Sequence, residues 1–254
     1  MSKSYRHVAA FVADQPWAIL RETLSEIEAV LAWHLDGHTY TAEELHARIG
    51  DPQKAEASKR GAVAVLPVQG IIAHRIGGMT EMSWGISTER ITGMFRQALA
   101  DPQVGAIVFD VNSPGGTVAG VTELAAEIYA ARGVKPIVAH VNAMAASAAY
   151  WIASAADSIV STPSGSVGSV GIVVAHTDST AADAREGVTR EVISAGKYKA
   201  EGFGPLTDES RAALQSRVDD AYATMTADIG RGRGVTAKAV RAGFGEGRVV
   251  SASR

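Results

Sequence analysis

Three observations predict an α/β fold with a mostly parallel sheet. From about residue 62 onward, short apolar runs alternate with amphipathic helical stretches, which is typical of parallel strands joined by crossover helices. Several of the apolar runs end in glycine-rich turns. The composition, 46% hydrophobic and 20% charged over 254 residues, is that of a globular chain with a sizeable core.

Residues 1–58 lack this alternation and are expected to form a small helical appendage with its linker, leaving 59–254 as the main domain. Asp14 can cap a helix that has Pro16 in its first turn. Apolar residues then recur at three- and four-residue spacings, at Trp17, Leu20, Leu24, Ile27 and Leu31. The capping-box sequence at 41–44 predicts a second short helix ending at Gly50.

In the main domain, strands are predicted where β-branched and aliphatic residues are concentrated between turn residues. These runs lie at 62–72, 104–111, 136–141, 158–161, 170–176, 189–194 and 247–250. Helices are predicted where apolar residues recur at helical spacing, at 87–101, 118–131, from 147 onward, at 179–186 and at 207–230. Ser87 and Thr207 are side chains suited to cap two of these helices, and Gly70 predicts a bulge in the first strand.

Ser147 is the residue around which the domain is organised. It lies where the strand 136–141 and its following turn give way to a helix rich in alanine. At that junction its hydroxyl would face the free amides and the positive end of the helix dipole, which favour developing negative charge. A helix cap, or a small residue that permits close packing, is the alternative interpretation of Ser147 by itself.

Two other stretches bear on Ser147. The strand 104–111 ends in the sequence NSPGG, at 112–116, whose glycines let a ligand approach the backbone closely. The strand 189–194 is followed by AGKYK, which contains Lys197 and Lys199. Each stretch alone is also explained as an ordinary turn or a solvated surface.

Taken together, the ordered motifs resemble those of the signal peptide peptidase A family of serine–lysine proteases. The motifs are SPGG at 113–116, MAAS at 144–147, GSVGI at 168–172 and Gly196-x-x-Lys199, and the resemblance covers about residues 62–250. The Clp-type proteases share the SPGG turn and the serine-opened helix. The resemblance therefore implies a Clp/crotonase-like spiral of ββα units, and phage head-maturation proteases are the members that the chain resembles most.

The resemblance also implies a role for each matching residue. Ser147 corresponds to the nucleophile and Lys199 to the general base, while Ser169 corresponds to the serine that hydrogen-bonds the lysine. The amides of Gly116 and Ala148 correspond to the oxyanion hole. The family places its lysine three residues after the glycine, which selects Lys199 over the neighbouring lysine.

The substrate is expected to be an extended peptide that adds as a strand beside Gly115 and Gly168. Small side chains such as Ala146 predict a narrow pocket, so that small or apolar residues would be preferred immediately before the cut.

His176 is the main rival base, because it ends a predicted strand with Asp178 and Asp183 nearby. A Clp-type histidine would lie within 166–172, where the sequence has none. Two other classes stay open: a catalytically silent scaffold or capsid component, and a crotonase-like acyl-CoA enzyme, which would also use paired oxyanion amides.

Composition narrows the function further. The chain has no cysteine, which excludes disulfides and cysteine catalysis, and its net charge of −3 gives no reason to expect nucleic acid as a partner. No window approaches the ~18–20 apolar residues of a membrane span. No metal or other cofactor is expected.

The sequence thus predicts an intracellular peptidase, in the host cytoplasm or inside a phage prohead, that cleaves scaffold and capsid proteins and perhaps its own chain. A soluble bacterial peptidase that degrades signal peptides is the alternative. The polar segment 196–205 cannot by itself exclude water from Lys199, so a homo-oligomer is expected. Family members continue beyond the strand at 247–250, which suggests that the end at Arg254 is a truncation.

Overall fold

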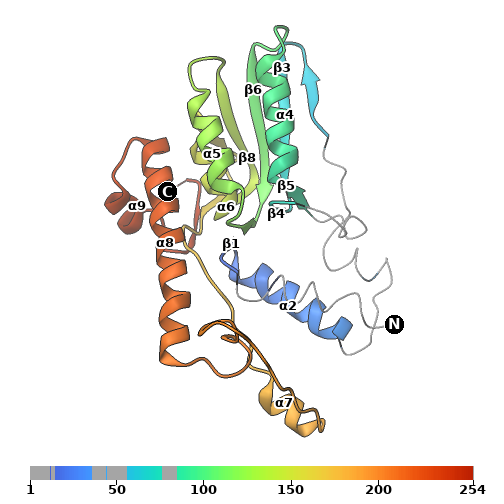
Figure 1. The fold of residues 1–254 in the computed structure, drawn as a ribbon. Coiled ribbons are helices and arrows are strands. Elements are labelled where there is room, and N and C mark those ends of the chain that lie inside the picture. Colours follow the sequence, from blue (N-terminus) through green and yellow to red (C-terminus); the bar gives the residue numbers. More distant parts are fainter. Residues whose placement is uncertain (1–11, 13–14, 36–43, 45–55, 76–84, 254) are drawn as a thin grey trace.

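The fold is taken from a computed structural model that describes residues 12, 15–35, 44, 56–75 and 85–253. Its strands are β1 (Trp17–Ile19), β2 (Ser58–Arg60), β3 (Val63–Gln69), β4 (Ile71–Ala73), β5 (Gly85–Ser87), β6 (Ala106–Ser113), β7 (Gly115–Thr117), β8 (Ile137–Ala146), β9 (Ser158–Ser161), β10 (Ser166–Gly168) and β11 (Val249–Ser251). Its helices are α2 (Arg21–Leu35), α4 (Thr88–Ala100), α5 (Val121–Ala130), α6 (Ala148–Ser154), α7 (Thr180–Arg185), α8 (Asp208–Arg233) and α9 (Ala237–Gly243). Figure 1 shows these elements in place.

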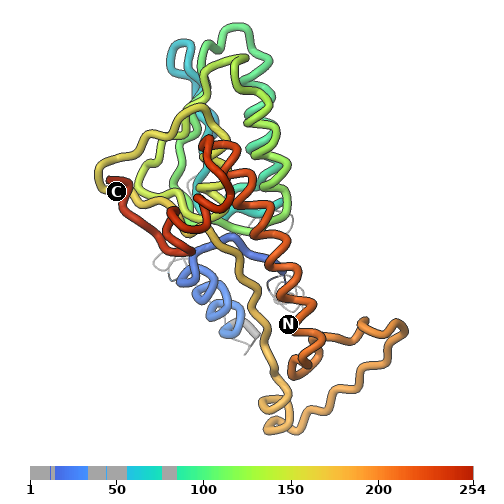
Figure 2. The backbone as a smooth tube through the Cα atoms, turned by 90° about the vertical axis from the view of Figure 1, so that its left-hand side faces the viewer, coloured from blue at the N-terminus to red at the C-terminus, as the bar shows by residue number. Residues whose placement is uncertain are grey.

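The large sheet has the strand order β11-β10-β8-β6-β3-β2, and β9 also pairs with β8. Its centre is parallel, since β3, β6, β8, β9 and β10 all run in the same direction. The outer strands β2 and β11 are antiparallel to their neighbours. Helices α4 and α5 cover one face of this sheet (Figures 1 and 2).

A second, small sheet has the order β1-β7-β4-β5. Strands β3 and β6 of the large sheet each continue, after one residue, into β4 and β7 of the small one. Helices α4 and α5 then follow, which gives the repeated ββα arrangement predicted from the motifs. The predicted fold class is therefore confirmed.

Local signals predicted the helix starts well. Ser87 caps α4 by accepting a hydrogen bond from the amide of Arg90, at 3.1 Å. Thr207 caps α8 through a capping box with Ser210. Gly70, with a φ of 70°, separates β3 from β4, so the predicted bulge is the corner between the two sheets.

Three predicted elements differ from the structure. The appendage helix begins at Arg21 rather than near Asp14, and Trp17–Ile19 is the strand β1. The run 170–176 forms a single bridge, at Val173, instead of a strand. The run 189–194 is irregular and pairs with none of the described strands. Apart from Glu44, the predicted second appendage helix lies outside the described residues.

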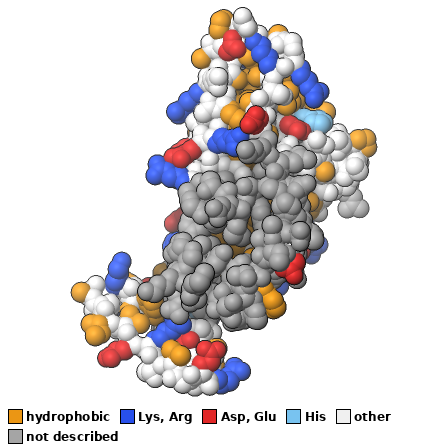
Figure 3. All heavy atoms as spheres, turned by 90° about the vertical axis from the view of Figure 1, so that its right-hand side faces the viewer, with side chains coloured by type: hydrophobic (Ala, Val, Ile, Leu, Met, Phe, Trp, Pro, Cys, Tyr) orange, Lys and Arg blue, Asp and Glu red, His pale blue; other side chains and the backbone are white. Residues whose placement is uncertain are grey.

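The segment 174–206, here called the arm, carries α7 and connects the site region to α8. Figure 2 shows it projecting away from the large sheet before it returns to the start of α8. Large apolar side chains are exposed along it (lower left in Figure 3), namely Val188, Val192, Ile193, Tyr198 and Phe203. Acidic and basic side chains are interspersed elsewhere on the face shown in Figure 3.

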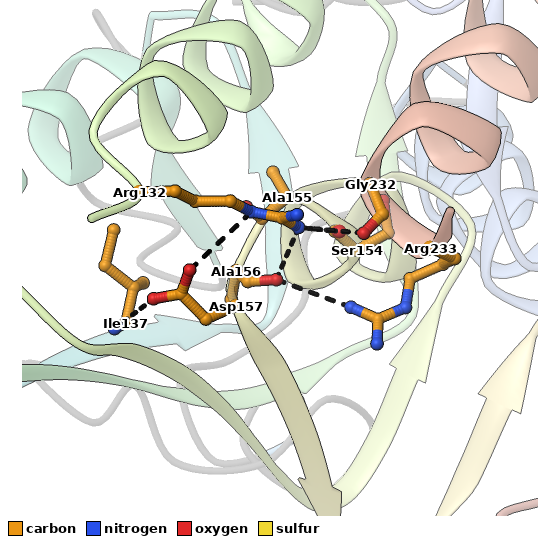
Figure 4. A network of polar contacts seen from close by, with 8 residues as sticks. All are labelled: Arg132, Ile137, Ser154, Ala155, Ala156, Asp157, Gly232 and Arg233. Atoms are coloured by element: carbon orange, nitrogen blue, oxygen red, sulfur yellow. Dashed lines mark hydrogen bonds and ion pairs between the residues drawn. The ribbon is translucent and has the colours of Figure 1, made fainter. Parts of the chain in front are cut away.

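Arg132 fixes the far end of α6 (Figure 4). Its guanidinium donates to the carbonyls of Ser154, Ala155, Ala156 and Gly232, at 2.6–3.1 Å. These carbonyls end α6 and α8, where the helices have no internal donors left. Burial lowers the pKa of Arg132, and the nearby carboxylate of Asp157 opposes that shift. The helix that starts beside Ser147 is thus held at its opposite end.

Candidate active site

Ser147 joins β8 to α6 in a strained backbone conformation. Its φ is 53° and its ψ −113°, in a region that side chains other than glycine rarely adopt. Among the described residues, the other non-glycine residues with positive φ are Ala143, Ser169 and Glu246. Such strain persists only where the surrounding structure enforces it, and it concentrates at functional sites. Two of these strained residues, Ser147 and Ser169, are predicted site residues.

The strand ends of the large sheet meet around Ser147. Ser113 at the end of β6 is level with Ala145 of β8, and Gly168 at the end of β10 is level with Ala146. The amide of Ser147 donates to the carbonyl of Gly168, at 2.8 Å. Carboxyl ends of neighbouring parallel strands are where α/β proteins place their ligands.

The SPGG turn packs directly against this junction. The amide of Gly115 donates to the hydroxyl of Ser113, at 3.1 Å. A Cβ added to Gly115 would lie 3.1 Å from the carbonyl oxygen of Ala146 and would collide with that of Ala18. One added to Gly116 would collide with the carbonyl of Ile72. Both positions require glycine, so the turn and Ser147 are held together by close backbone contact.

The Ser147 hydroxyl is buried at this site. The residue is 0% exposed, and its Oγ donates to the carbonyl of Gly171 at 3.3 Å, a long hydrogen bond. Its side chain makes no capping hydrogen bond to α6. The interpretation of Ser147 as a conventional helix cap is therefore not supported. The first amides of α6, beginning with Ala148, have no partner within the helix.

Ser169 follows the end of β10 and is also buried, at 7% exposure. Its φ is 52°, and its amide donates to the carbonyl of Arg248, which precedes β11, at 2.8 Å. The chain thus turns sharply one residue after the carbonyl that holds Ser147. Ser113, Ser147 and Ser169 are brought to one edge of the sheet.

Lys199 lies elsewhere, on the arm. It is exposed, in a turn closed by its amide donating to the carbonyl of Gly196 at 3.1 Å. Within the described part of the chain, no hydrogen bond joins Lys199 to Ser147 or Ser169. The structure of the single chain therefore gathers the predicted nucleophile, oxyanion turn and helper serine, but not the predicted base.

The rival bases are engaged in other contacts. The amine of Lys197 donates to the hydroxyl of Tyr198 at 2.7 Å and to Glu209 at 3.0 Å, and these hydrogen bonds raise the pKa of Lys197. His176 Nε2 is 2.8 Å from the carbonyl of Gly204. Since a carbonyl only accepts, that nitrogen carries the proton and cannot take one from a serine. In the described ranges, no group of three or more His, Asp or Glu could hold a metal ion.

Three short strands at the site, β1, β7 and β10, were missed at the sequence level. The strand β1 lies antiparallel to β7, with Ala18 opposite Gly116. On its other side, Trp17 exchanges two hydrogen bonds with Val173, at 2.8 and 2.9 Å. Residues far apart in sequence thus cover the SPGG turn. The apolar run after Pro16 is a signal that could have indicated a strand.

Residues 130–253 match the sequence pattern of Peptidase family S49. This part of the chain belongs to that family. The S49 region contains Ser147, Ser169 and Lys199, whereas the SPGG turn precedes it. The resemblance inferred from the ordered motifs is confirmed.

Similar curated proteins include phage and bacterial proteases. The head-tail preconnector protein GP5 of Enterobacteria phage P21 is 36% identical over 180 residues, covering 70% of this chain and 36% of its own length. The capsid assembly protease C of Escherichia phage lambda is 34% identical over 194 residues, covering 73% of this chain and 44% of its own. Protease 4 of Salmonella typhi is 39% identical over 120 residues, which cover 47% of this chain and 19% of that protein. The chain thus spans less than half the length of each of these relatives.

A solved structure of a membrane-bound stomatin-specific protease aligns with a TM-score of 0.46 at 14% identity, covering 77% of this chain and 75% of that one. Among the described helices, none is both long enough and apolar enough to cross a membrane.

Proposed function

We propose that this chain is a serine endopeptidase with Ser147 as nucleophile and Lys199 as general base. The placement of Ser147 supports this proposal most directly. It is a buried serine with positive φ, at the N-terminus of α6 and against a turn that only glycine can form. The division into an appendage at 1–58 and a protease domain at 59–254 is part of the proposal.

In the proposed reaction, the neutral amine of Lys199 takes the proton of the Ser147 hydroxyl as its Oγ attacks the scissile carbonyl. The amides of Gly116 and Ala148 donate to the resulting oxyanion. The lysine then gives its proton to the leaving amine. In the second step Lys199 takes a proton from water, the water attacks the acyl group, and the proton returns to the Ser147 oxygen as the acid product leaves. Ser169 holds the lysine amine in position through a hydrogen bond.

This chemistry requires the arm to be rearranged relative to the single chain. A general base must lie within hydrogen-bond reach of the proton that it takes, and Lys199 is exposed on the arm with no hydrogen bond to Ser147 among the described residues. We propose that a homo-oligomer, or the bound peptide, covers the arm, brings Lys199 to Ser147 and excludes water there. The exposed apolar side chains of the arm support this proposal, because such surfaces typically mark interaction sites.

The relatives point to the biological setting. Because two of them are named for head-tail connection and capsid assembly, we propose a phage or prophage capsid-maturation protease. Its substrates would be scaffold and capsid proteins in the host cytoplasm or prohead, and its own chain. Similarity to Protease 4 favours the alternative, a soluble bacterial peptidase that degrades signal peptides. A catalytically silent scaffold protein is the third candidate.

A fluorophosphonate probe tests the nucleophile. The purified chain is incubated with the probe for hours, because Ser147 is buried, and the modified residue is identified by mass spectrometry. We expect a single adduct at Ser147. The Ser147→Ala chain should neither react nor cleave a peptide library, since nucleophile and base act as one unit.

Ser154→Ala is the matched control, because Ser154 is another buried serine of α6 and its hydroxyl donates only to the carbonyl of Trp151. It should react and cleave like the parent. Lys199→Arg should not cleave, because a guanidinium keeps its proton. A chain that folds but neither reacts nor cleaves would support the silent scaffold protein instead.

A further inference from the structure

Strand β1 lies between two other segments of the chain, β7 and the segment around Val173. On one side it pairs with β7, where the amide of Leu20 donates to the carbonyl of Pro114 at 3.0 Å and the amide of Val118 donates to that of Pro16 at 3.3 Å. On the other side, Trp17 is bridged to Val173. The extended segment β1 is thus held by backbone hydrogen bonds on both of its edges, in the way that a peptide is recognised when it adds as a strand to a sheet.

The register places one residue of β1 at the proposed reaction centre. Hydrogen-bonded pairs alternate along an antiparallel ladder, two residues apart. Because residues 20 and 16 bond to 114 and 118, the pair Ala18–Gly116 between them is a bonded pair as well. The amide of Gly116, proposed above for the oxyanion hole, then faces the carbonyl of Ala18. The following peptide bond, between Ala18 and Ile19, takes the position of a bond to be cut.

The side chains of β1 point in alternate directions. Trp17 and Ile19 pack with Val12, Leu24 and Leu31 in a cluster belonging to the appendage. Ala18 instead packs into the core of the main domain and is 0% exposed. Only the small residue faces the site, as a narrow pocket before the scissile bond would require.

We propose that β1 occupies, in cis, the groove that binds peptide substrates, with Ala18 in the position immediately before the cut. The ligand class of the groove is an extended peptide, antiparallel to β7, with a small residue at that position. The chain is therefore self-inhibited until β1 leaves. This inference rests on the proposed function for the identity of the reaction centre.

The fit of β1 leaves one polar group unpaired. The Thr117 hydroxyl is buried, and it has no hydrogen-bond partner among the described residues. Thr117 is level with Trp17, whose indole donates instead to the carbonyl of Val12 at 3.0 Å. Buried polar groups are normally paired. A substrate with a polar side chain in place of Trp17 would pair this hydroxyl and so compete well with β1.

A reducible disulfide that holds β1 against β7, here called the disulfide lock, tests the inference without requiring catalysis. In a Ser147→Ala background, the full chain is given the changes Trp17→Cys and Thr117→Cys. These residues form a non-bonded antiparallel pair, whose typical Cα separation of ~4.5 Å permits a disulfide. The chain has no other cysteine. Binding of a fluorescent peptide with the sequence of residues 14–22 is measured by anisotropy, in the oxidised and reduced forms.

We expect the reduced form to bind the peptide at least ~10-fold more tightly than the oxidised form, because a tethered occupant competes at ~mM effective concentration. A second variant, Ala18→Lys, places a charge at the buried position of β1 and should displace β1 from the groove. This variant should also bind the fluorescent peptide at least ~10-fold more tightly than its control. That control is Ser25→Lys, which adds the same charge to an exposed position of α2. Circular dichroism verifies the fold, and if Ala18→Lys does not fold, the disulfide lock carries the test.

Equal affinity of the oxidised and reduced forms would overturn the inference, and so would absence of binding to every form. The two proposals fail separately. If Ser147 reacts with fluorophosphonate and cleaves peptides while the disulfide lock changes nothing, only the groove assignment is wrong. If the disulfide lock changes peptide binding while Ser147 never reacts with fluorophosphonate in any variant, the groove assignment is supported and the assignment of Ser147 as nucleophile is wrong.

Discussion

Two serines with positive φ lie on either side of one hydrogen bond. The amide of Ser147 donates to the carbonyl of Gly168, and Ser169 is the next residue. This arrangement turns the chain sharply at both positions and fixes Ser147 without using its hydroxyl. The Oγ retains only a long contact to the carbonyl of Gly171, at 3.3 Å, and a weakly held hydroxyl is easily redirected toward a base.

Ser169 offers a test of the proposed lysine base. If its hydroxyl positions the amine of Lys199, Ser169→Ala should lower kcat by ~10- to 100-fold, which corresponds to loss of about 1–3 kcal/mol in one hydrogen bond. The measurement is steady-state cleavage of a reporter peptide. We expect KM to change little, since the hydroxyl does not touch the peptide.

Two further variants distinguish the hydroxyl from the backbone. Ser169→Gly relieves the positive φ and also lacks the hydroxyl, so it should be as slow as Ser169→Ala. Ser166→Ala removes a serine at the other end of β10 and should cleave like the parent. Full activity in Ser169→Gly would show that only the turn matters at this position.

Predictions from sequence succeeded at the residue scale where the cause was local. Ser147 was placed at a strand-to-helix junction because alanines of high helix propensity follow a β-branched run. Lys199 was assigned by the spacing of a motif, and spacing along the chain does not determine where an exposed arm lies in space. Ser147 therefore lies at the junction where the sequence predicted it, between β8 and α6, while Lys199 is exposed on the arm.

At the scale of elements, β1 shows why the start of the first helix was predicted wrongly. Trp17 and Leu20 fit the helical spacing of α2, so the pattern favoured one longer helix. Without β1, however, the small sheet would end at β7, and the unpaired amides and carbonyls of that edge would favour an added strand. The tertiary partner outweighed the local pattern for Trp17–Ile19, and the helix begins only after the edge is covered, at Arg21.

The arm shows the opposite error. Residues 189–194 have the β-branched composition of a strand but join neither of the two described sheets and are irregular. Composition favours a strand only where a partner strand completes its hydrogen bonds. The arm is attached near its end instead. Lys197 and the hydroxyl of Tyr198 both donate to Glu209 in the first turn of α8, at 3.0 and 2.7 Å. This contact fixes the turn that carries Lys199.

The attachment should depend on pH. Hydrogen bonds from Tyr198 and Lys197 lower the pKa of Glu209 from its ordinary value of 4.5. A lowered carboxyl pKa stabilises the attachment above pH 4.5, and this contribution is lost as the pH falls through the lowered value. The pKa of Lys197 is raised from 10.5, so its contribution is present below pH 10.5 and is lost as the pH rises through the raised value.

The measurement is NMR of chain with 13C-labelled tyrosine, from about pH 7 to about pH 3, a range that brackets ordinary carboxyl values. The ring resonances of Tyr198 should move at a pH below 4.5. In Glu209→Gln the transition should be absent, while tyrosines away from the arm, such as Tyr129, behave as in the parent. An identical Tyr198 titration in both chains would show that the contact does not form in solution.

At the scale of the whole molecule, the arm projects away from the large sheet (Figure 2). Ser147 lies at the junction of β8 and α6, whereas Lys199 lies on the arm and is exposed. The arm also exposes apolar side chains that the domain leaves uncovered, with Ile193 90% and Phe203 67% exposed. Burial of such surface is favourable by roughly 25 cal/mol per Å². An assembly that covers the arm would therefore gain stability and desolvate the lysine at the same time.

We therefore expect a homo-oligomer whose cleavage rate per chain falls on dilution, measured together with mass by light scattering. The double change Ile193→Glu and Phe203→Glu places charges on the arm, so it should lower the mass to that of the monomer and abolish cleavage. Val134→Glu is the matched control, because Val134 is 64% exposed in the turn between α5 and β8. Its mass and activity should equal the parent's. A monomeric parent with full, dilution-independent activity would refute the oligomer.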